Sequence, residues 1–108
     1  MSKYFKEIEQ NMNVRFLDKL DQARELANIP FHINSAFRTK EDNDRVGGKH
    51  NSSHLWGLAV DIKVTDSRTR FIVLSALISV GFNRIGIADT FIHVDDDNAK
   101  DFNVIWTY

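Results

Sequence analysis

The chain of 108 residues has the length of one domain, and its 43% hydrophobic content is enough for a single modest core. Its 14 basic and 15 acidic residues give a net charge of −1, so charge offers no reason to expect a nucleic-acid or membrane-surface partner. The absence of cysteine excludes disulfides, thiolate zinc sites and a cysteine nucleophile. Any metal would therefore be held by His, Asp or Glu side chains.

The first predicted element is a helix at 14–28, where apolar residues recur at helical spacing behind an N-cap at Asn13. A second long helix is expected to begin after a cap at Ser67 and to end at Gly81. The other segments show strand alternation or breaker residues. In chain order they are a strand at 31–35, a short helix at 39–44, a polar loop at 46–53, and strands at 58–64, 84–87, 91–95 and 104–107.

Helices mixed with short, hairpin-like strands predict an α+β fold. We expect a small antiparallel sheet with helices packed on one side, in a single domain over residues 1–108. No stretch approaches the roughly 18 apolar residues that a membrane span needs. The first ten residues, MSKYFKEIEQ, lack the apolar region of a signal peptide. We therefore expect synthesis in the cytoplasm, with release by another route if the protein acts elsewhere.

An aspartate interrupts the apolar strand predicted at 58–64. Alternation points Asp61 and the small Ala59 to one face of this strand, away from its apolar residues. His54 comes just before Gly57, a residue that allows a sharp turn of the chain. The imidazole of His54 can therefore lie over the same face as the Asp61 carboxylate.

A second histidine lies in the strand predicted at 91–95, where His93 and Asp95 share one face. If this strand neighbours the one at 58–64, then His54, Asp61 and His93 converge. Two imidazoles and one carboxylate without a fourth protein ligand make an open zinc site with a water in the fourth position. The alternative is that the histidines are ordinary hydrogen-bonded residues and that Asp61 has some other partner. The residues alone leave both interpretations open.

Residues 52–61, SSHLWGLAVD, fit the S-x-H-x-x-G-x-A-x-D signature of the zinc D-alanyl-D-alanine carboxypeptidase family, which shares its fold with the hedgehog signalling domain. Order and spacing agree over about residues 12–108, and the compact length resembles that of short phage-encoded members. Three further segments match the family in order. They are SAFR at 35–38, which resembles S-x-x-R, then Asn43 with VGG at 46–48, and FIHVD at 91–95, which resembles F-x-H-x-D.

The resemblance implies a zinc peptidase of the hedgehog/DD-peptidase fold. His54, Asp61 and His93 would be the zinc ligands. Ser52 would help to hold the terminal carboxylate or neighbouring backbone of the substrate, and Arg38 would bind substrate and stabilise the developing oxyanion. The implied substrate is the peptide stem or cross-bridge of bacterial peptidoglycan. We expect a monomer that serves wall breach or lysis, acting as carboxypeptidase or endopeptidase at the cell wall of the host or from a virion.

One position departs from the family pattern. Many members place Glu or Asp three residues before the last histidine as the general base, whereas this chain has Thr90, which cannot take a proton at neutral pH. Asp95 shares the face of His93 and is the better candidate, either for the proton-carrying group or for a carboxylate that fixes the His93 tautomer. Asp89 would point to the opposite face, and His50 in the polar loop is a third option.

The departure at Thr90 motivates a first alternative, a wall-binding module that keeps zinc for structure and is weak or inactive in catalysis. A second alternative is a structural virion protein without metal. Trp106 and Tyr108, at the end of the chain, are expected to be core or edge residues.

Overall fold

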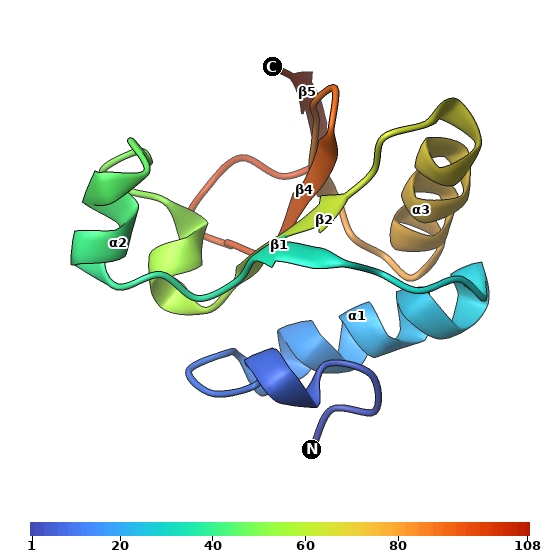
Figure 1. The fold of residues 1–108 in the computed structure, drawn as a ribbon, viewed down its shortest axis with the longest axis horizontal. Helices are drawn as coiled ribbons and strands as arrows, with labels where there is room; N and C mark the ends of the chain where they lie inside the picture. The colour runs from blue at the N-terminus through green and yellow to red at the C-terminus, as the bar shows by residue number, and fades with distance from the viewer.

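Five strands form one sheet in a computed structural model that describes residues 1–108 (Figure 1). The elements in chain order are the 3-10 turn η1 (Lys6–Ile8), helix α1 (Val14–Ala27), strand β1 (Ile33–Ser35), helix α2 (Lys40–Arg45), the 3-10 turn η2 (Ser53–Trp56), strand β2 (Ala59–Lys63), helix α3 (Ser67–Ser79), and strands β3 (Arg84–Ile87), β4 (Phe91–Asp95) and β5 (Val104–Thr107). The strand order is β1-β2-β4-β3-β5, so the α+β prediction is confirmed.

The sheet is mixed, which corrects the prediction of a purely antiparallel one. Strands β1, β2, β4 and β3 pair antiparallel, whereas β5 pairs parallel to β3. The connection from β4 passes the end of β3 and returns on its far side. Strand β5 therefore runs opposite to β4, as in a hairpin, but β3 lies between them. Alternation along a strand predicts its faces and not its neighbours.

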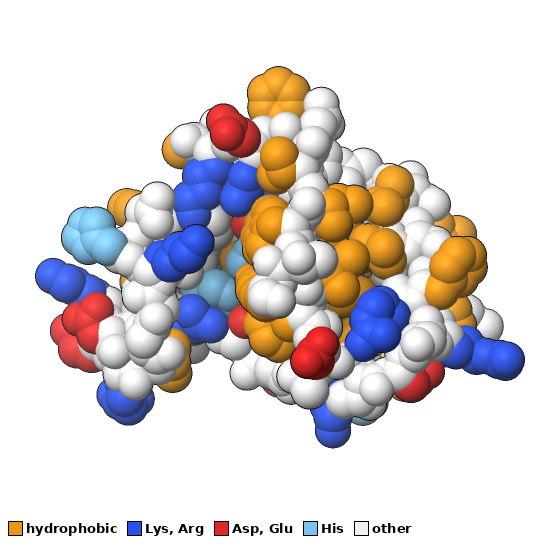
Figure 2. All heavy atoms as spheres, turned by 90° about the horizontal axis from the view of Figure 1, so that it is seen from above, with side chains coloured by type: hydrophobic (Ala, Val, Ile, Leu, Met, Phe, Trp, Pro, Cys, Tyr) orange, Lys and Arg blue, Asp and Glu red, His pale blue; other side chains and the backbone are white.

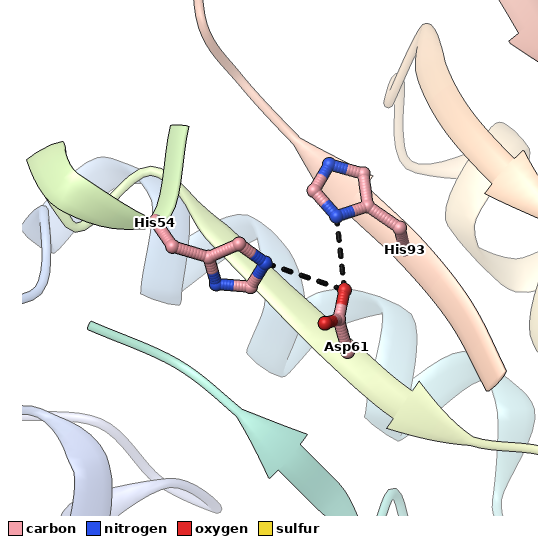
Figure 3. Close-up of side chains that lie close together, drawn as sticks. All are labelled: His54, Asp61 and His93. Atoms are coloured by element: carbon pink, nitrogen blue, oxygen red, sulfur yellow. Dashed lines mark hydrogen bonds and ion pairs between the residues drawn. The ribbon is translucent and has the colours of Figure 1, made fainter. Parts of the chain in front are cut away.

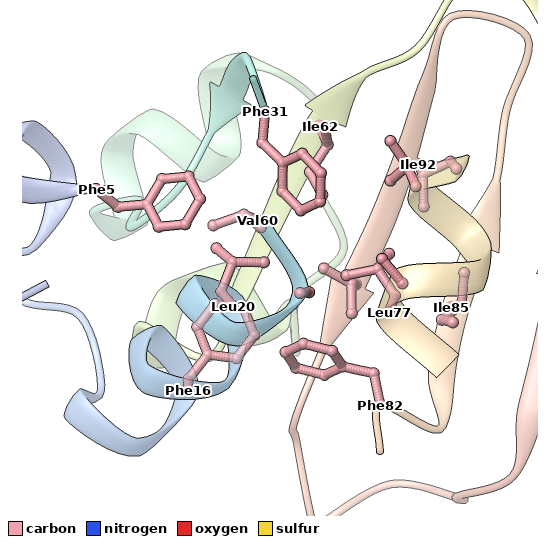
Figure 4. Packing of buried hydrophobic residues seen from close by; sticks show 14 of the residues in the cluster. Phe5, Phe16, Leu20, Phe31, Val60, Ile62, Leu77, Phe82, Ile85 and Ile92 are labelled. Atoms are coloured by element: carbon pink, nitrogen blue, oxygen red, sulfur yellow. The ribbon is translucent and has the colours of Figure 1, made fainter. Parts of the chain in front are cut away.

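Helices α1 and α3 pack against each other and cover one face of the sheet (Figure 1). Helix α1 begins where the Asn13 side chain accepts the backbone N–H of Phe16 at 2.9 Å. Figure 4 shows Leu20 of α1 facing Val60 of β2, and Phe16 of α1 beside Phe82, with the ring centres 5.6 Å apart. Each such side chain, when fully buried, stabilises the fold by about 1.5–3 kcal/mol. This apolar layer supports the sheet from below and leaves its other face free for polar residues.

Two local features of the helices differ from the sequence prediction. The N-cap of α3 is Asp66, whose carboxylate accepts the Thr69 backbone N–H, and not Ser67. The short helix α2 does not join the helical layer over the core. It contacts η2 instead and stands apart from α1 and α3 in Figure 1. None of the helices combines the length and apolar character that crossing a bilayer requires.

Gly57 sets the turn that leads from η2 into β2. Its φ of +68° lies in the left-handed region, and a Cβ there would meet the backbone oxygen of Asn11 at 2.2 Å. The Gly57 carbonyl also accepts the backbone N–H of Asn13 at 2.9 Å, next to the start of α1. The sharp turn predicted at this glycine is therefore present, and it is packed against the N-terminal segment.

Candidate functional site

One row of directly paired residues crosses the sheet on the face away from the core. Ser35 pairs with Asp61, Asp61 with His93, His93 with Gly86, and Gly86 with Trp106. Directly paired residues project to the same face, so the register alone puts the Asp61 carboxylate beside the His93 ring. The neighbourhood of β2 and β4 on which the predicted convergence depended is thus present.

His54 reaches the same face from η2. The backbone N–H of His54 donates to the Ser52 hydroxyl at 3.3 Å, where Ser52 is the N-cap of this turn. The buried imidazole donates its Nδ1–H to the carbonyl of Ala36 at 2.7 Å. That hydrogen bond orients the ring so that Nε2 faces Asp61 Oδ1 at 3.3 Å (Figure 3).

Both histidines place a ring nitrogen next to the same oxygen, Asp61 Oδ1 (Figure 3). His93 Nδ1 lies 2.9 Å from this oxygen, and the three candidate ligand atoms all lie within 4.8 Å of one another. Zinc bonds of about 2.0–2.2 Å hold neighbouring ligand atoms roughly 3.3 Å apart around a tetrahedral ion. The donor set and its spacing therefore suit a divalent metal bound by His54, Asp61 and His93.

The carboxylates and histidines of the cluster shift the pKa values of Asp61 and His93 in opposite directions. Burial raises the pKa of Asp61, but hydrogen bonds from His54 and His93 outweigh it and hold that pKa well below its usual value. Burial lowers the pKa of His93, but hydrogen bonds to Asp61 and Asp95 outweigh it and raise that pKa. Both ring nitrogens of His93 face carboxylates, so a metal at this site would replace the Nδ1 proton.

A family model described as Peptidase M15 matches residues 2–95, which is most of the chain and includes all three candidate ligands. The chain belongs to the peptidase M15 family. A search among curated proteins finds no match. Membership confirms the resemblance to the zinc carboxypeptidase-like enzymes and makes this protein a peptidase.

In this M15 peptidase, Asp95 lies at the Nε2 edge of the His93 ring, away from the Nδ1 edge that faces Asp61. Its buried carboxylate accepts the Nε2–H of His93 at 2.7 Å and the Nε–H of Arg84 at 2.7 Å. Burial raises the pKa of Asp95, but the hydrogen bonds from His93 and Arg84 outweigh it and lower the pKa overall. Sequence reasoning paired Asp95 with His93 but missed Arg84, which begins the strand predicted at 84–87 and lies in no motif.

Arg38 is held in place on the other side of Asp61. Its guanidinium donates to Ser35 Oγ at 3.0 Å, to Asn43 Oδ1 at 3.3 Å and to Asp61 Oδ2 at 3.4 Å. Asn43 is 1% exposed and also donates to the Lys49 carbonyl at 2.9 Å, which ties the glycine loop to α2. The residues that resemble the S-x-x-R segment and the following Asn therefore form one hydrogen-bonded group that supports the candidate metal ligand Asp61.

The cluster opens into a cleft of about 900 Å³. Figure 2 shows histidine side chains at the bottom of a hollow, with Lys and Arg side chains on one side of it and hydrophobic side chains on the other. Trp106 lies on the edge strand β5, as expected, and both Trp106 and Tyr108 also line the cleft beside Phe91, which the sequence did not predict. Burial raises the pKa of Tyr108, so its phenol stays protonated at neutral pH and can donate a hydrogen bond.

The remaining candidates divide between the cleft and the surface. Ser52 lines the cleft, as does Arg38. Thr90, Asp89 and His50 are all exposed, and none of them lines the cleft. Thr90 accepts the backbone N–H of Val64 through its carbonyl. Neither Asp89 nor His50 is therefore placed to replace the acid that is missing at Thr90.

Proposed function

We propose that this M15 peptidase is a zinc enzyme that hydrolyses an amide bond in the peptide part of bacterial peptidoglycan, as a D-alanyl carboxypeptidase or endopeptidase. The observation that carries the proposal is the convergence of His54, Asp61 and His93 at the bottom of an open cleft, in a chain of the M15 family. Phage origin and a role in wall breach or lysis belong to the same proposal, and they rest on the resemblance to short phage-encoded members.

His54 Nε2, one Asp61 oxygen and His93 Nδ1 would hold the ion. Bound there, zinc would supply Lewis-acid activation of water and of the scissile carbonyl. The protein residues prepare that site. The Ala36 carbonyl and the Asp95 carboxylate each fix the tautomer of one histidine, and Arg38 holds Asp61 Oδ2. The ligands are thus oriented before a substrate enters.

The cleft offers a peptide two kinds of contact. Arg38, Lys49 and Lys100 give one side positive charge, which suits the free carboxylates of a peptidoglycan stem. Arg38 has two further N–H groups beyond its three hydrogen bonds, and these can steady negative charge that develops on the carbonyl oxygen. Ser52 lies beside His54 in the cleft and can hold the substrate backbone or its terminal carboxylate.

The proton-carrying role that the sequence suggested for Asp95 stays a prediction. Its oxygens already accept from His93, Arg84 and the backbone N–H of Asp97. These contacts favour the other role considered for Asp95, which is to fix the His93 tautomer. The two roles differ in one measurement. Loss of a proton carrier in Asp95→Asn would lower kcat and leave zinc affinity unchanged, whereas loss of an orienting carboxylate would weaken zinc binding.

The test is hydrolysis of defined muropeptides by zinc-loaded protein. One substrate ends in D-alanyl-D-alanine and the other is a cross-linked dimer, and products are identified by mass spectrometry. We expect either release of D-alanine or cleavage within the stem or cross-bridge, lost on chelation and in His54→Ala. His50→Ala, which changes an exposed histidine outside the cleft, is the matched control and should cleave normally. Intact substrates in the presence of bound zinc would contradict the proposal.

The second candidate is a wall-binding module with little or no catalysis. It is favoured by Thr90 in place of the usual acid and by the engagement of Asp95 with Arg84. Such a module would bind the same muropeptides in a zinc-dependent way without releasing products. Isothermal titration beside the cleavage assay separates the two candidates. A structural virion protein without metal would show neither zinc uptake nor thermal stabilisation by zinc, which a ligand of the folded state produces by mass action.

A further inference from the structure

We propose that Arg84 is a positioning residue of the metal site, which acts through Asp95 to make Nδ1 the metal-binding nitrogen of His93. The inference rests on the proposed zinc site and concerns a residue that lies in no recognised motif. Arg84 is on β3 and Asp95 is on β4, two neighbouring antiparallel strands. Its first support is a continuous chain of short contacts from the guanidinium to the metal ligand.

The hydrogen bonds lead from Arg84 through Asp95 to His93. Arg84 Nε lies 2.7 Å from Asp95 Oδ1, and Asp95 Oδ2 lies 2.7 Å from His93 Nε2. The Asp95 side chain is 1% exposed and that of Arg84 is 12% exposed, so the pair is almost sealed from water. Arg84 Nε and the backbone N–H of Asp97 both donate to Oδ1, which turns Oδ2 toward His93 as a hydrogen-bond acceptor. His93 Nε2 is the donor that faces this oxygen.

The far end of Arg84 is also fixed. Its Nη1 donates to the carbonyl of Asp101 in the loop before β5, and its guanidinium carbon lies 5.1 Å from the centre of the Trp106 ring. The same indole ring lies 5.5 Å from the His93 ring. The Trp106 indole can contact both Arg84 and His93 because the residue beneath it is Gly86. A Cβ at Gly86 would lie 2.5 Å from Trp106 Nε1. The aromatic ring therefore covers the ion pair from the side of the cleft.

This arrangement gives the two histidines opposite metal-binding nitrogens. His54 donates Nδ1–H to Ala36 and presents Nε2, whereas His93 donates Nε2–H to Asp95 and presents Nδ1. A free imidazole has no such fixed choice, and the partner of the second nitrogen decides it. Without Arg84, the Asp95 carboxylate loses its cation, and its hold on the His93 tautomer weakens. Arg84 thus supports the site without touching metal or substrate.

The experiment measures zinc affinity and the protonation of the ring nitrogens in Arg84→Gln. We expect zinc affinity, from competition with a chromophoric chelator, to fall by about 10- to 100-fold, as is typical when a partner of a metal-bound histidine is lost. Long-range ¹H–¹⁵N spectra of the zinc-loaded wild type should show a proton on His93 Nε2, and this signal should weaken or broaden in the variant. A merely structural arginine would change neither the tautomer nor the affinity of folded protein.

Two further variants keep the test decisive. Arg84→Lys keeps the charge but not the planar donor geometry, so it should recover part of the lost affinity. It also provides the readout if Arg84→Gln does not fold. Arg70→Gln removes an exposed arginine that donates to the Asp89 carbonyl, and it should bind zinc as the wild type does. Wild-type affinity in folded Arg84→Gln and Arg84→Lys would overturn the proposal, and so would zinc bound to His93 Nε2.

Failure of this inference is distinguishable from failure of the proposed function. Wild-type protein that binds zinc through His93 Nδ1, loses affinity in Arg84→Gln and yet cleaves no muropeptide contradicts the proposed catalysis and supports the role of Arg84. Cleavage of muropeptide by Arg84→Gln with wild-type zinc affinity supports the proposed catalysis and contradicts the role of Arg84.

Discussion

The two histidines of the cluster are held in different ways. His54 lies on a short 3-10 turn, and a backbone carbonyl 18 residues earlier in the chain orients its ring. His93 lies in the middle of the sheet, and its ring is oriented by a buried carboxylate that pairs with an arginine of the next strand. The first environment depends on a turn and the loop packed against it. The second depends on strand register.

The difference teaches that the two histidines of one candidate metal site can have two kinds of support. The support of His54 can be broken by changing the turn, because the turn places the ring against the Ala36 carbonyl that orients it. The His93 side is coupled to the core, because the same strands carry Ile92 and Val94 into the apolar layer. Changes at each side should therefore differ in their effects on zinc binding and on the free energy of unfolding.

The largest effect is expected where the two sides meet. Asp61→Asn removes the carboxylate that both histidines face. Zinc affinity should fall by more than about 100-fold, which exceeds the loss that is typical when a residue hydrogen-bonded to a metal ligand is changed. Chelator competition measures the change. Asp18→Asn, at an exposed position of α1, is the matched control and should keep wild-type affinity. Zinc affinity within tenfold of wild type in Asp61→Asn would exclude Asp61 as a ligand.

The next change breaks the His54 side. Gly57→Ala places a Cβ at 2.2 Å from the Asn11 backbone oxygen and imposes a left-handed conformation on alanine. Overpacking of this kind costs about 1–3 kcal/mol and the backbone conformation about 1–2 kcal/mol more. Gly47→Ala has a similar φ of +71° with open space around it, so it should lose only the smaller amount. Denaturant unfolding compares the two, and equal losses would contradict the close packing at Gly57.

A smaller effect is expected from the matching change on the His93 side. Gly86→Ala displaces the Trp106 indole, but its backbone has no positive φ, so the free energy of unfolding should fall by about 1 kcal/mol. Zinc affinity should fall as well, because Trp106 no longer covers Arg84. In a Trp106→Leu background the same substitution should cost less, since the clash is gone. Additive effects of the two substitutions on the free energy of unfolding would show that the space at Gly86 is not needed for the Trp106 indole.

The smallest expected effect is a pH dependence of the metal-free protein. His93 has a raised pKa in the fold, so its contribution to stability is complete below its unfolded pKa of about 6.5 and is lost as pH rises through the raised value. Denaturant midpoints in the presence of a chelator should therefore decrease above about pH 7. Zinc should remove the decrease, because the ion replaces the proton.

Histidine substitutions show which group is responsible for this slope. His93→Gln should flatten it, whereas His32→Gln, at an exposed position, should retain it. A slope that persists in His93→Gln would assign the pH dependence to another group.

Much of the local structure was predictable from the sequence. The bounds expected for β3, β4 and β5 are those observed, and the Asn13 cap is present. These features depend on spacing and on hydrogen bonds within a few residues. The N-cap of α3 was misplaced by one residue, because Asp66 and Ser67 are both good caps and only the backbone decides between them.

Other features could not be predicted, because they depend on which strands are neighbours. Nothing in residues 104–107 indicates that β5 lies parallel to β3. That placement brings Trp106 over Gly86 and into the cleft. The pairing of Arg84 with Asp95 likewise follows from the approach of two strands.

The sequence by itself determined the family, the bounds of most elements and the three residues that share a face as candidate metal ligands. Only the tertiary structure decided which nitrogen each histidine presents, that Arg84 engages Asp95, and that the sheet is mixed. The physical reason is the distance along the chain over which each interaction acts. Periodicity and capping act over one or two turns of chain, whereas a ring tautomer is chosen by whichever donor or acceptor the long-range register brings next to it.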